Sequence, residues 1–220
     1  AMRITFMNEL ANYCEKVGAN VDNVRKGMGA DQRIGKRFLF PGIGYGGSCF
    51  PKDVDAFIHL SEKLGYEFEL LKAVRKINEN QRKIFLKKIK DALWIVKGKK
   101  IGVLGLSFKP NTDDIRNAPS LEIISALLKE GADIHCFDPQ AIPKAKEVLK
   151  TKVRYAKDPY KVARNADCLV IVTEWNEFKE LDLLRIKKLM RQPVIIDGRN
   201  IYEPEELKRL GFRYIGMGRG

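Results

Sequence analysis

The feature that most constrains the fold is a change of pattern after Gly98. Up to this point helix-type periodicity runs through most of the chain, and beyond it short apolar segments alternate with amphipathic ones. Strands separated by helices form parallel sheets, because each crossover needs room for a helix. The sequence therefore predicts an α/β protein with two domains: a helical domain at residues 1–97, and a doubly wound parallel sheet at residues 98–220.

Four apolar segments are predicted to form strands of this Rossmann-like sheet. They are KKIGVLGLSF, DIHCFDP, DCLVIVTEW and PVIIDGRN. A charged residue follows the apolar part of each segment: Lys109, Asp138, Glu174 and Arg199. Ligands of doubly wound sheets bind beyond the carboxyl ends of the strands. We therefore expect an anionic ligand near Lys109 and Arg199.

The helical domain is predicted to contain a helix over residues 69–96. Its apolar positions are Leu70, Val74, Ile77, Ile84 and Leu93. A helix of this length is typical of one that bridges domains or subunits, although the periodicity fits a core helix equally well. An earlier helix has one apolar face, made of Met2, Phe6, Leu10, Tyr13 and Val17. Because no capping residue precedes it, we interpret it as a helix entered midway, with chain missing upstream.

Composition and charge narrow the classes of function. A net charge of +13 would suit nucleic acid, an anionic membrane or phosphorylated small molecules. Lys and Arg are spread over amphipathic helices such as RKIFLKKIKDALW, without a nucleic-acid-binding signature, so we expect no nucleic-acid partner. Charged residues interrupt every apolar run before the roughly 20 residues of a membrane helix, and they also interrupt the amino terminus. We therefore expect neither a membrane association nor a signal peptide.

The cysteines argue against a metal site and a disulfide framework. The four of them are widely spaced, without a CxxC pair, and only two histidines accompany them. His59 and His135 lie in no metal or triad pattern, and we interpret both as structural or exposed to solvent. This use of cysteine fits a reducing cytoplasm.

One cysteine has a setting suited to chemistry. Cys49 lies in GYGGSCFPKD, between a glycine turn and a helix predicted to begin at Pro51, with Lys52 nearby. A helix amino terminus and a neighbouring cation favour a thiolate, so a nucleophile is plausible. The alternative is a small buried hydrophobic residue, the usual role of a lone cysteine. We assign that role to Cys14, Cys136 and Cys168.

Five segments in the same order resemble the UDP-glucose dehydrogenase family. They are DQRIGKRFLFPGIG, GGSCFPKDV, LGLSFKPNTDDIRNAPS, VTEWNEFKELD and IIDGRNIY. The resemblance implies an NAD-dependent enzyme that oxidises the C6 alcohol of UDP-glucose to a carboxylate in two hydride transfers. It implies that Cys49 is the nucleophile, which passes through a thiohemiacetal and a thioester, and that Asp53 orients the hydrolytic water.

The resemblance also implies the binding residues. Arg33 would reach the nucleotide sugar of the neighbouring subunit, and Lys109 and Arg199 would contact the substrate's anionic part. Lys52 and Arg116 would contact the NAD pyrophosphate. The pocket for the nucleotide sugar would be lined by the FLFPG segment and a glycine of the next turn, which are Phe38, Leu39, Phe40, Pro41, Gly42 and Gly46.

The pattern of this family is incomplete in the chain. The GxGxxG fingerprint of an NAD-binding Rossmann domain, placed directly after a strand, does not occur, and GVLGLSF resembles it only in part. We therefore expect a fragment that binds UDP but forms no NADH alone. Two alternatives stay open: a related dehydrogenase acting on GDP-mannose or UDP-N-acetylmannosamine, and a non-catalytic UDP-binding module that forms homodimers through its long helix.

Overall fold

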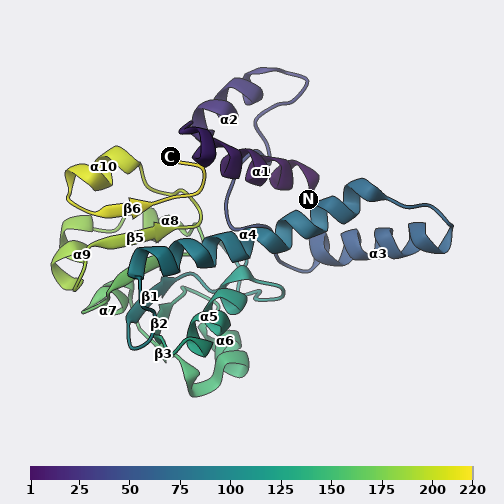
Figure 1. Cartoon of the computed structure of the whole chain (residues 1–220). Helices are drawn as coiled ribbons and strands as arrows, with labels where there is room; N and C mark the ends of the chain where they lie inside the picture. The colour runs from purple at the N-terminus through teal and green to yellow at the C-terminus, as the bar shows by residue number, and fades with distance from the viewer. Residues whose placement is uncertain (220) are drawn as a thin grey trace.

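The computed structural model describes residues 1–219, and its centre is a six-stranded parallel sheet (Figure 1). The strands are β1 (Lys100–Leu104), β2 (Asp133–Phe137), β3 (Arg154–Tyr155), β4 (Cys168–Ile171), β5 (Val194–Asp197) and β6 (Arg213–Ile215). Their order is β3-β2-β1-β4-β5-β6, and all neighbouring pairs are parallel. The direction of winding reverses between β1 and β4, so the predicted doubly wound α/β fold is confirmed.

Helices precede the sheet and connect its strands. The first four are α1 (Met2–Val17), α2 (Val21–Ala30), α3 (Cys49–Lys63) and α4 (Glu69–Leu93). The others are α5 (Pro119–Lys129), α6 (Ile142–Leu149), the 3₁₀ turn η1 (Lys150–Lys152), α7 (Pro159–Ala163), α8 (Asn176–Lys179), α9 (Leu183–Leu189) and α10 (Pro204–Arg209). Among the described residues, no helix is both long and apolar enough to cross a membrane.

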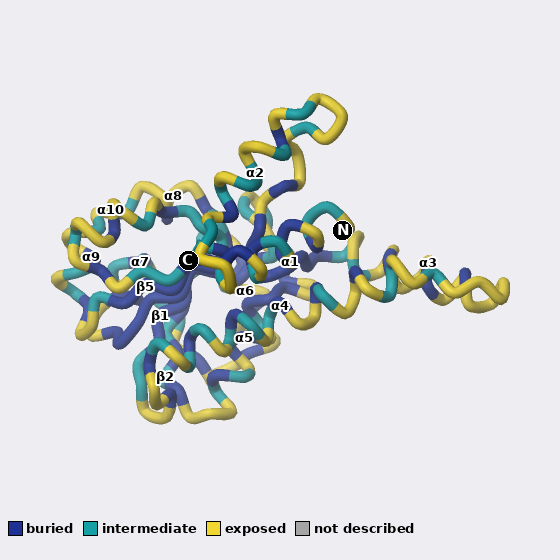
Figure 2. Tube along the Cα trace, turned by 45° about the horizontal axis from the view of Figure 1, so that its top comes forward, coloured by how far each residue is buried: buried dark blue, intermediate teal, exposed yellow. Residues whose placement is uncertain are grey.

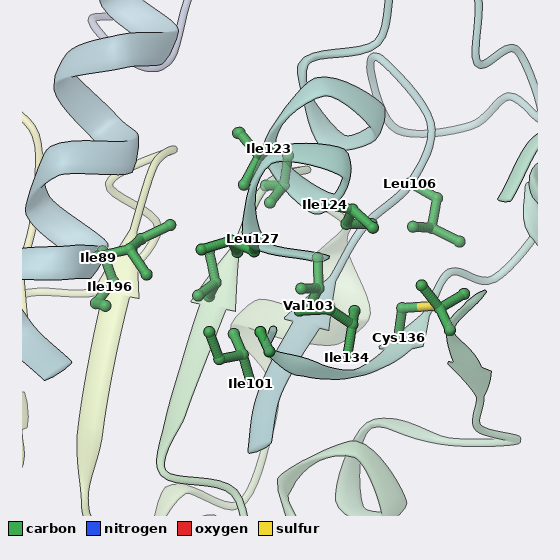
Figure 3. Close-up of a cluster of buried hydrophobic side chains, with 14 of the residues drawn as sticks. Ile89, Ile101, Val103, Leu106, Ile123, Ile124, Leu127, Ile134, Cys136 and Ile196 are labelled. Carbon is green, nitrogen blue, oxygen red and sulfur yellow. The ribbon is translucent and has the colours of Figure 1, made fainter. Parts of the chain in front are cut away.

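The two faces of the sheet carry separate apolar clusters, because side chains alternate along each strand. One face packs against α4, α5 and α6 through a cluster that includes Phe85, Ile89, Ile123, Leu127 and Leu149. Figure 3 shows part of this cluster, with Ile101 and Val103 of β1 beneath α5. The other face packs against α7, α8, α9 and α10 through Val162, Phe178, Ile186 and Leu207. The carboxyl-terminal half of α4 is thus a core helix of the sheet.

Replacing Phe85 by alanine is expected to lower the free energy of unfolding by about 3–5 kcal/mol, as for other buried aromatic residues. Phe85 is fully buried, and its ring reaches the backbone beside Gly198 at the end of β5. Urea unfolding measures the change. Leu64→Ala is the control, because Leu64 is 76% exposed and its truncation should change the stability by less than about 0.5 kcal/mol. Equal losses for both variants would contradict this account of the core.

The structure confirms the four predicted strands and adds two at the edges, β3 and β6, which have two and three residues. Helix α5 has Pro119 at its first position, and Gly131, just after its end, takes a φ of 82°. The long helix ends at Leu93 instead of Val96. Its buried row includes Val74 and Leu93 as predicted, whereas Leu70 is exposed.

The predicted apolar face of α1 is wrong. The row from Met2 to Val17 on α1 is largely exposed, and the helix instead buries Met7, Ala11 and Cys14. These three side chains pack with Val21 of α2 and with Leu39, whereas Met2 and Phe6 border an open apolar groove. On α3, Val54 and Ile58 are buried, but Phe57 and Leu64 face solvent. Figure 2 shows α3 and the start of α4 as an arm that extends from the rest of the molecule.

Candidate functional site

A pocket of about 530 Å³ lies between the helical part and the carboxyl ends of β1, β4 and β5. Five residues that the sequence predicts for substrate binding line it: Phe38, Phe40, Gly46, Lys109 and Arg199. Further lining residues are Ile4, Arg37, Gly44, Tyr45, Phe50, Phe108 and Glu174. The pocket therefore combines three cationic side chains with an aromatic wall, which suits an anionic ligand that has a ring.

Arg199 joins three loops at the floor of the pocket. Its Nε donates to the Val172 carbonyl at 2.9 Å, and its Nη2 donates to the Phe108 carbonyl at 3.1 Å. Nε also lies 3.0 Å from Oε2 of Glu174. The side chain is only 16% exposed. Arg199 therefore fixes the ends of β1 and β4 against the end of β5, besides presenting charge to the pocket.

Lys109 is the more accessible cation of the pocket. Its Nζ lies 5.3 Å from the centre of the Phe108 ring, and the residue is exposed. An ammonium group in this position can approach a phosphate without first breaking an ion pair.

Asp138 is not a pocket residue, although the sequence groups it with the strand-end charges. Its carboxylate is buried and accepts hydrogen bonds from groups at the ends of β1, β2 and β4. The donors to Oδ2 are Leu106 N, Ser107 N, Ser107 Oγ and Trp175 Nε1, and those to Oδ1 are Gln140 N and Ala141 N. Asp138 thus holds the loop that carries Phe108 and Lys109.

Cys49 is exposed at the first position of α3. The helix begins at Cys49 and not at the predicted Pro51, so the thiol lies in the first turn of α3. Ser48 Oγ lies 3.8 Å from its sulfur. The thiol is not enclosed in packed hydrocarbon, and this leaves it accessible to a substrate or a reagent.

Aromatic side chains connect the Cys49 loop to the pocket. The Phe50 ring meets Tyr45 and Phe38 edge to face, with ring centres 5.6 and 6.4 Å apart. Tyr45, Phe50 and Phe108 were not predicted as site residues. Their position beside GYGGSCF and before Lys109 was the available signal, but aromatic residues in loops are equally typical of local packing.

Both predicted NAD contacts, Lys52 and Arg116, and the predicted catalytic Asp53 lie at the surface near Cys49. Lys52 Nζ is 3.4 Å from Oδ1 of Asp53, and both side chains are mostly exposed. Arg116 pairs with Asp114, and this hydrogen bond lowers the pKa of the Asp114 carboxyl. The Arg116 carbonyl also accepts a hydrogen bond from Gly47 N at 2.9 Å, which connects Arg116 to the Cys49 loop.

Other predicted residues lie away from the pocket walls. Arg33 is 89% exposed in its side chain and is held by Asp31, whose pKa it lowers. Leu39 is buried in the small core of α1 and α2, and therefore does not line the pocket as predicted. Pro41 and Gly42 are buried and do not line the pocket either.

The remaining cysteines and histidines agree with their predicted structural roles. Cys14, Cys136 and Cys168 are buried, and burial raises the pKa of Cys136 to about 12. His59 is exposed, while His135 lies in β2 beside Asp133. Within residues 1–219 no group of three His, Cys, Asp or Glu side chains is arranged to hold a metal.

The letters of the dinucleotide fingerprint do occur once, in Gly42, Gly44 and Gly47 of GIGYGG. No strand precedes them in the structure, since residues 31–48 contain neither a strand nor a helix. The strand–turn–helix setting that lets this pattern hold a pyrophosphate is therefore missing.

Comparison with known proteins gives matches along most of the chain. Residues 1–80 match the central domain of the UDP-glucose/GDP-mannose dehydrogenase family, and residues 102–204 match its UDP binding domain. A UDP-glucose 6-dehydrogenase of Bacillus subtilis is 47% identical over 100% of this chain and 48% of its own length. The chain thus spans about half the length of the curated relatives that it matches.

Solved structures agree with this assignment. A UDP-glucose dehydrogenase from the archaeon Pyrobaculum islandicum superposes with a TM-score of 0.87 at 35% identity, over 99% of this chain and 48% of its own. A UDP-D-ManNAc dehydrogenase from Pyrococcus horikoshii gives 0.85 at 31% identity, over 100% of this chain and 49% of its own. The chain belongs to the UDP-glucose/GDP-mannose dehydrogenase family and comprises that family's central and UDP-binding domains.

Proposed function

We propose that this chain is the substrate-binding and covalent-catalysis part of an NAD-dependent UDP-glucose 6-dehydrogenase. The observation that carries the proposal is the pocket that contains Lys109 and Arg199 next to the loop of an exposed Cys49. Relatives named UDP-glucose 6-dehydrogenase, at 42–47% identity, favour UDP-glucose over other nucleotide sugars. The proposed domain division is the one predicted from the sequence, at residues 1–97 and 98–220.

In this proposal, Cys49 performs the covalent step. The first oxidation converts the C6 alcohol to an aldehyde, and the Cys49 thiolate adds to it to form a thiohemiacetal. The second oxidation gives a thioester, which water hydrolyses to the carboxylate with release of the thiol. Asp53 lies four residues after Cys49 on α3 and would orient that water. Each oxidation transfers one hydride.

The substrate contacts follow from the charges and rings of the pocket. Lys109 and Arg199 would bind the diphosphate, and Phe38, Phe40 and Gly46 would contact the uridine and ribose. Arg33 is exposed and lies outside the pocket, which fits the proposal that it reaches the site of a neighbouring subunit. Arg37 also lines the pocket and adds to its positive charge.

Of the residues in this chain, only Lys52 and Arg116 are proposed to contact NAD, at its pyrophosphate. Lys52 and Arg116 are exposed cations near Cys49, each within reach of a pyrophosphate. NAD supplies the hydride acceptor when bound, but residues 1–219 contain no glycine-rich turn between a strand and a helix to hold it. We therefore propose that hydride transfer requires an NAD-binding domain in addition to these residues, and that residues 1–220 alone form no NADH.

We further propose a homodimer that acts in the cytoplasm. An apolar groove of about 370 Å³ lies between α1 and α4, where Phe6 and Leu70 are each 51% exposed. Exposed apolar surface of this kind is typical of protein interfaces. The four cysteines are free, which fits a reducing compartment. The alternative of a UDP-binding and dimerisation module without catalysis keeps the same pocket and groove but gives Cys49 no role.

Titration calorimetry of residues 1–220 tests the proposed ligand. We expect binding of UDP and UDP-glucose, weakened about tenfold or more by Lys109→Ala, because a charge-assisted contact to phosphate contributes about 1.5–3 kcal/mol. Lys129→Ala is the matched control, since Lys129 is exposed at the end of α5 and does not line the pocket. A panel with GDP-mannose and UDP-N-acetylmannosamine should bind more weakly. No heat with any of these ligands would refute the proposal.

A further inference from the structure

The segment that leads to Cys49 is buried although it forms no helix or strand. Residues 41–47 are all buried, and they include four of the chain's glycines. A buried loop must find partners for its backbone N–H and C=O groups, because each unpaired group costs free energy. The partners of this loop come largely from side chains of α1 and α4.

Two fully buried amides hold Gly42 from opposite sides. Asn8 Oδ1 accepts the Gly42 N–H at 2.8 Å, and Gln81 Nε2 donates to the Gly42 carbonyl at 2.8 Å. Asn12 Nδ2 donates to Gln81 Oε1 at 2.9 Å and so fixes the orientation of that amide. Both polar groups of the Gly42 peptide are therefore satisfied by side chains.

Asn78 pairs with Tyr45 in the way that a neighbouring strand would. Its Oδ1 accepts the Tyr45 N–H at 2.8 Å, and its Nδ2 donates to the Tyr45 carbonyl at 3.1 Å. Arg82 Nη2 donates to the same carbonyl at 3.2 Å. The fit is close, since a Cβ on Gly44 would lie 2.6 Å from Asn78 Oδ1.

The last glycine of the loop is held by the segment before α5. Gly47 N donates to the Arg116 carbonyl at 2.9 Å, and Asn117 Nδ2 donates to the Gly47 carbonyl at 3.2 Å. A Cβ on Gly47 would meet the Phe108 ring at 2.7 Å. Three contacts along the loop thus connect α1, α4 and the β1–α5 connection to the residues just before Cys49.

Asn78 and Gln81 take two positions in the otherwise apolar buried row of α4, between Val74 and Phe85. A buried amide contributes less than a packed apolar side chain unless its partners need it. Here the partners are backbone groups of the Cys49 loop. We propose that Asn78, supported by Gln81 and Asn8, is a positioning residue that sets the place of Cys49 at the amino terminus of α3. This inference rests on the proposed function.

Two substitutions of Asn78 test the inference by the alkylation rate of Cys49, measured with iodoacetamide and peptide mass spectrometry on residues 1–220. Asn78→Leu removes both hydrogen bonds to Tyr45 and should slow alkylation about threefold or more, because the loop then no longer holds the sulfur at the exposed first position of α3. Asn78→Asp keeps the acceptor. When protonated it also donates to the Tyr45 carbonyl, so its rate relative to wild type should recover as the pH falls.

The control separates position from stability. Ile186→Ala removes a fully buried side chain on the opposite face of the sheet and should destabilise the fold by about 2–5 kcal/mol. It should leave the Cys49 rate unchanged, with all variants assayed where urea curves show them folded. A wild-type rate in Asn78→Leu, or equal slowing in Ile186→Ala, would overturn the inference. Calorimetry with UDP-glucose reports the proposed function separately. If the wild type does not bind UDP-glucose but Asn78→Leu still slows alkylation, the proposed function is rejected and the positioning role of Asn78 stands.

Discussion

Asp138→Leu is expected to lower the free energy of unfolding by about 4 kcal/mol or more, or to prevent folding. Leucine is similar in size to aspartate but accepts no hydrogen bond, so six donors around the carboxylate lose their partner. Each buried donor left unpaired costs about 1–3 kcal/mol. Some of these donors can reach water in the variant, which keeps the total below the sum. Urea or thermal unfolding followed by circular dichroism measures the loss.

Asp138→Asn separates the two sides of the carboxylate. An asparagine has one acceptor oxygen, and if that oxygen replaces Oδ2 it can still serve the backbone of Leu106 and Ser107 and the Trp175 indole. Its NH₂ group then faces the N–H groups of Gln140 and Ala141. We expect a loss of about half that of the leucine variant. Full stability in both variants would show that Asp138 does not organise the strand ends.

The sheet was predictable because its inner strands are apolar segments, and in β1, β4 and β5 both faces are almost wholly buried. In β4, Cys168 and Val170 pack on one side, and Leu169 and Ile171 pack on the other. The edge strands β3 and β6 have only two and three residues, with exposed positions in each. Patterns this short carry no periodicity, so no sequence argument could find them.

The face of α1 was mispredicted because the spacing of its large apolar residues does not identify the buried side. Periodicity identifies a row of apolar residues, but it does not say which row meets another helix. In this chain Met7, Ala11 and Cys14 meet α2 and Leu39, while the contact with α4 includes the polar pairs Asn12–Gln81 and Glu15–Lys88. The larger row containing Met2 and Phe6 borders an apolar groove instead.

The cations of the site were predicted, but the residues that organise it were not. Lys109 and Arg199 were found because they follow strands, and strand ends converge on one edge of the sheet. Asn78 and Gln81 interrupt an apolar row, so a single sequence gives them no evident role. A signal was present, since the row continues through Phe85 with the same spacing, which places both amides inside the core.

Replacing Cys49 by alanine is expected to abolish formation of the carboxylate, with kcat lowered about 10⁴-fold or more, as when other covalent nucleophiles are removed. The assay is NADH formation by the enzyme in which residues 1–220 are joined to an NAD-binding domain. Without the thiol no thioester forms, so oxidation should stop after the first hydride transfer. Binding of UDP-glucose by calorimetry should change little, because Cys49 lies beside the pocket and does not line it.

The control for this loss is Cys14→Ala, since Cys14 is buried between α1 and α2 and should affect stability without removing activity. In the wild-type chain iodoacetamide should modify the exposed Cys49, and it should leave the three buried cysteines unmodified. Two NADH per UDP-glucose from the Cys49→Ala enzyme would show that the reaction does not pass through this sulfur. The pocket would then belong to a dehydrogenase with a different hydrolytic step, because a non-catalytic module forms no NADH.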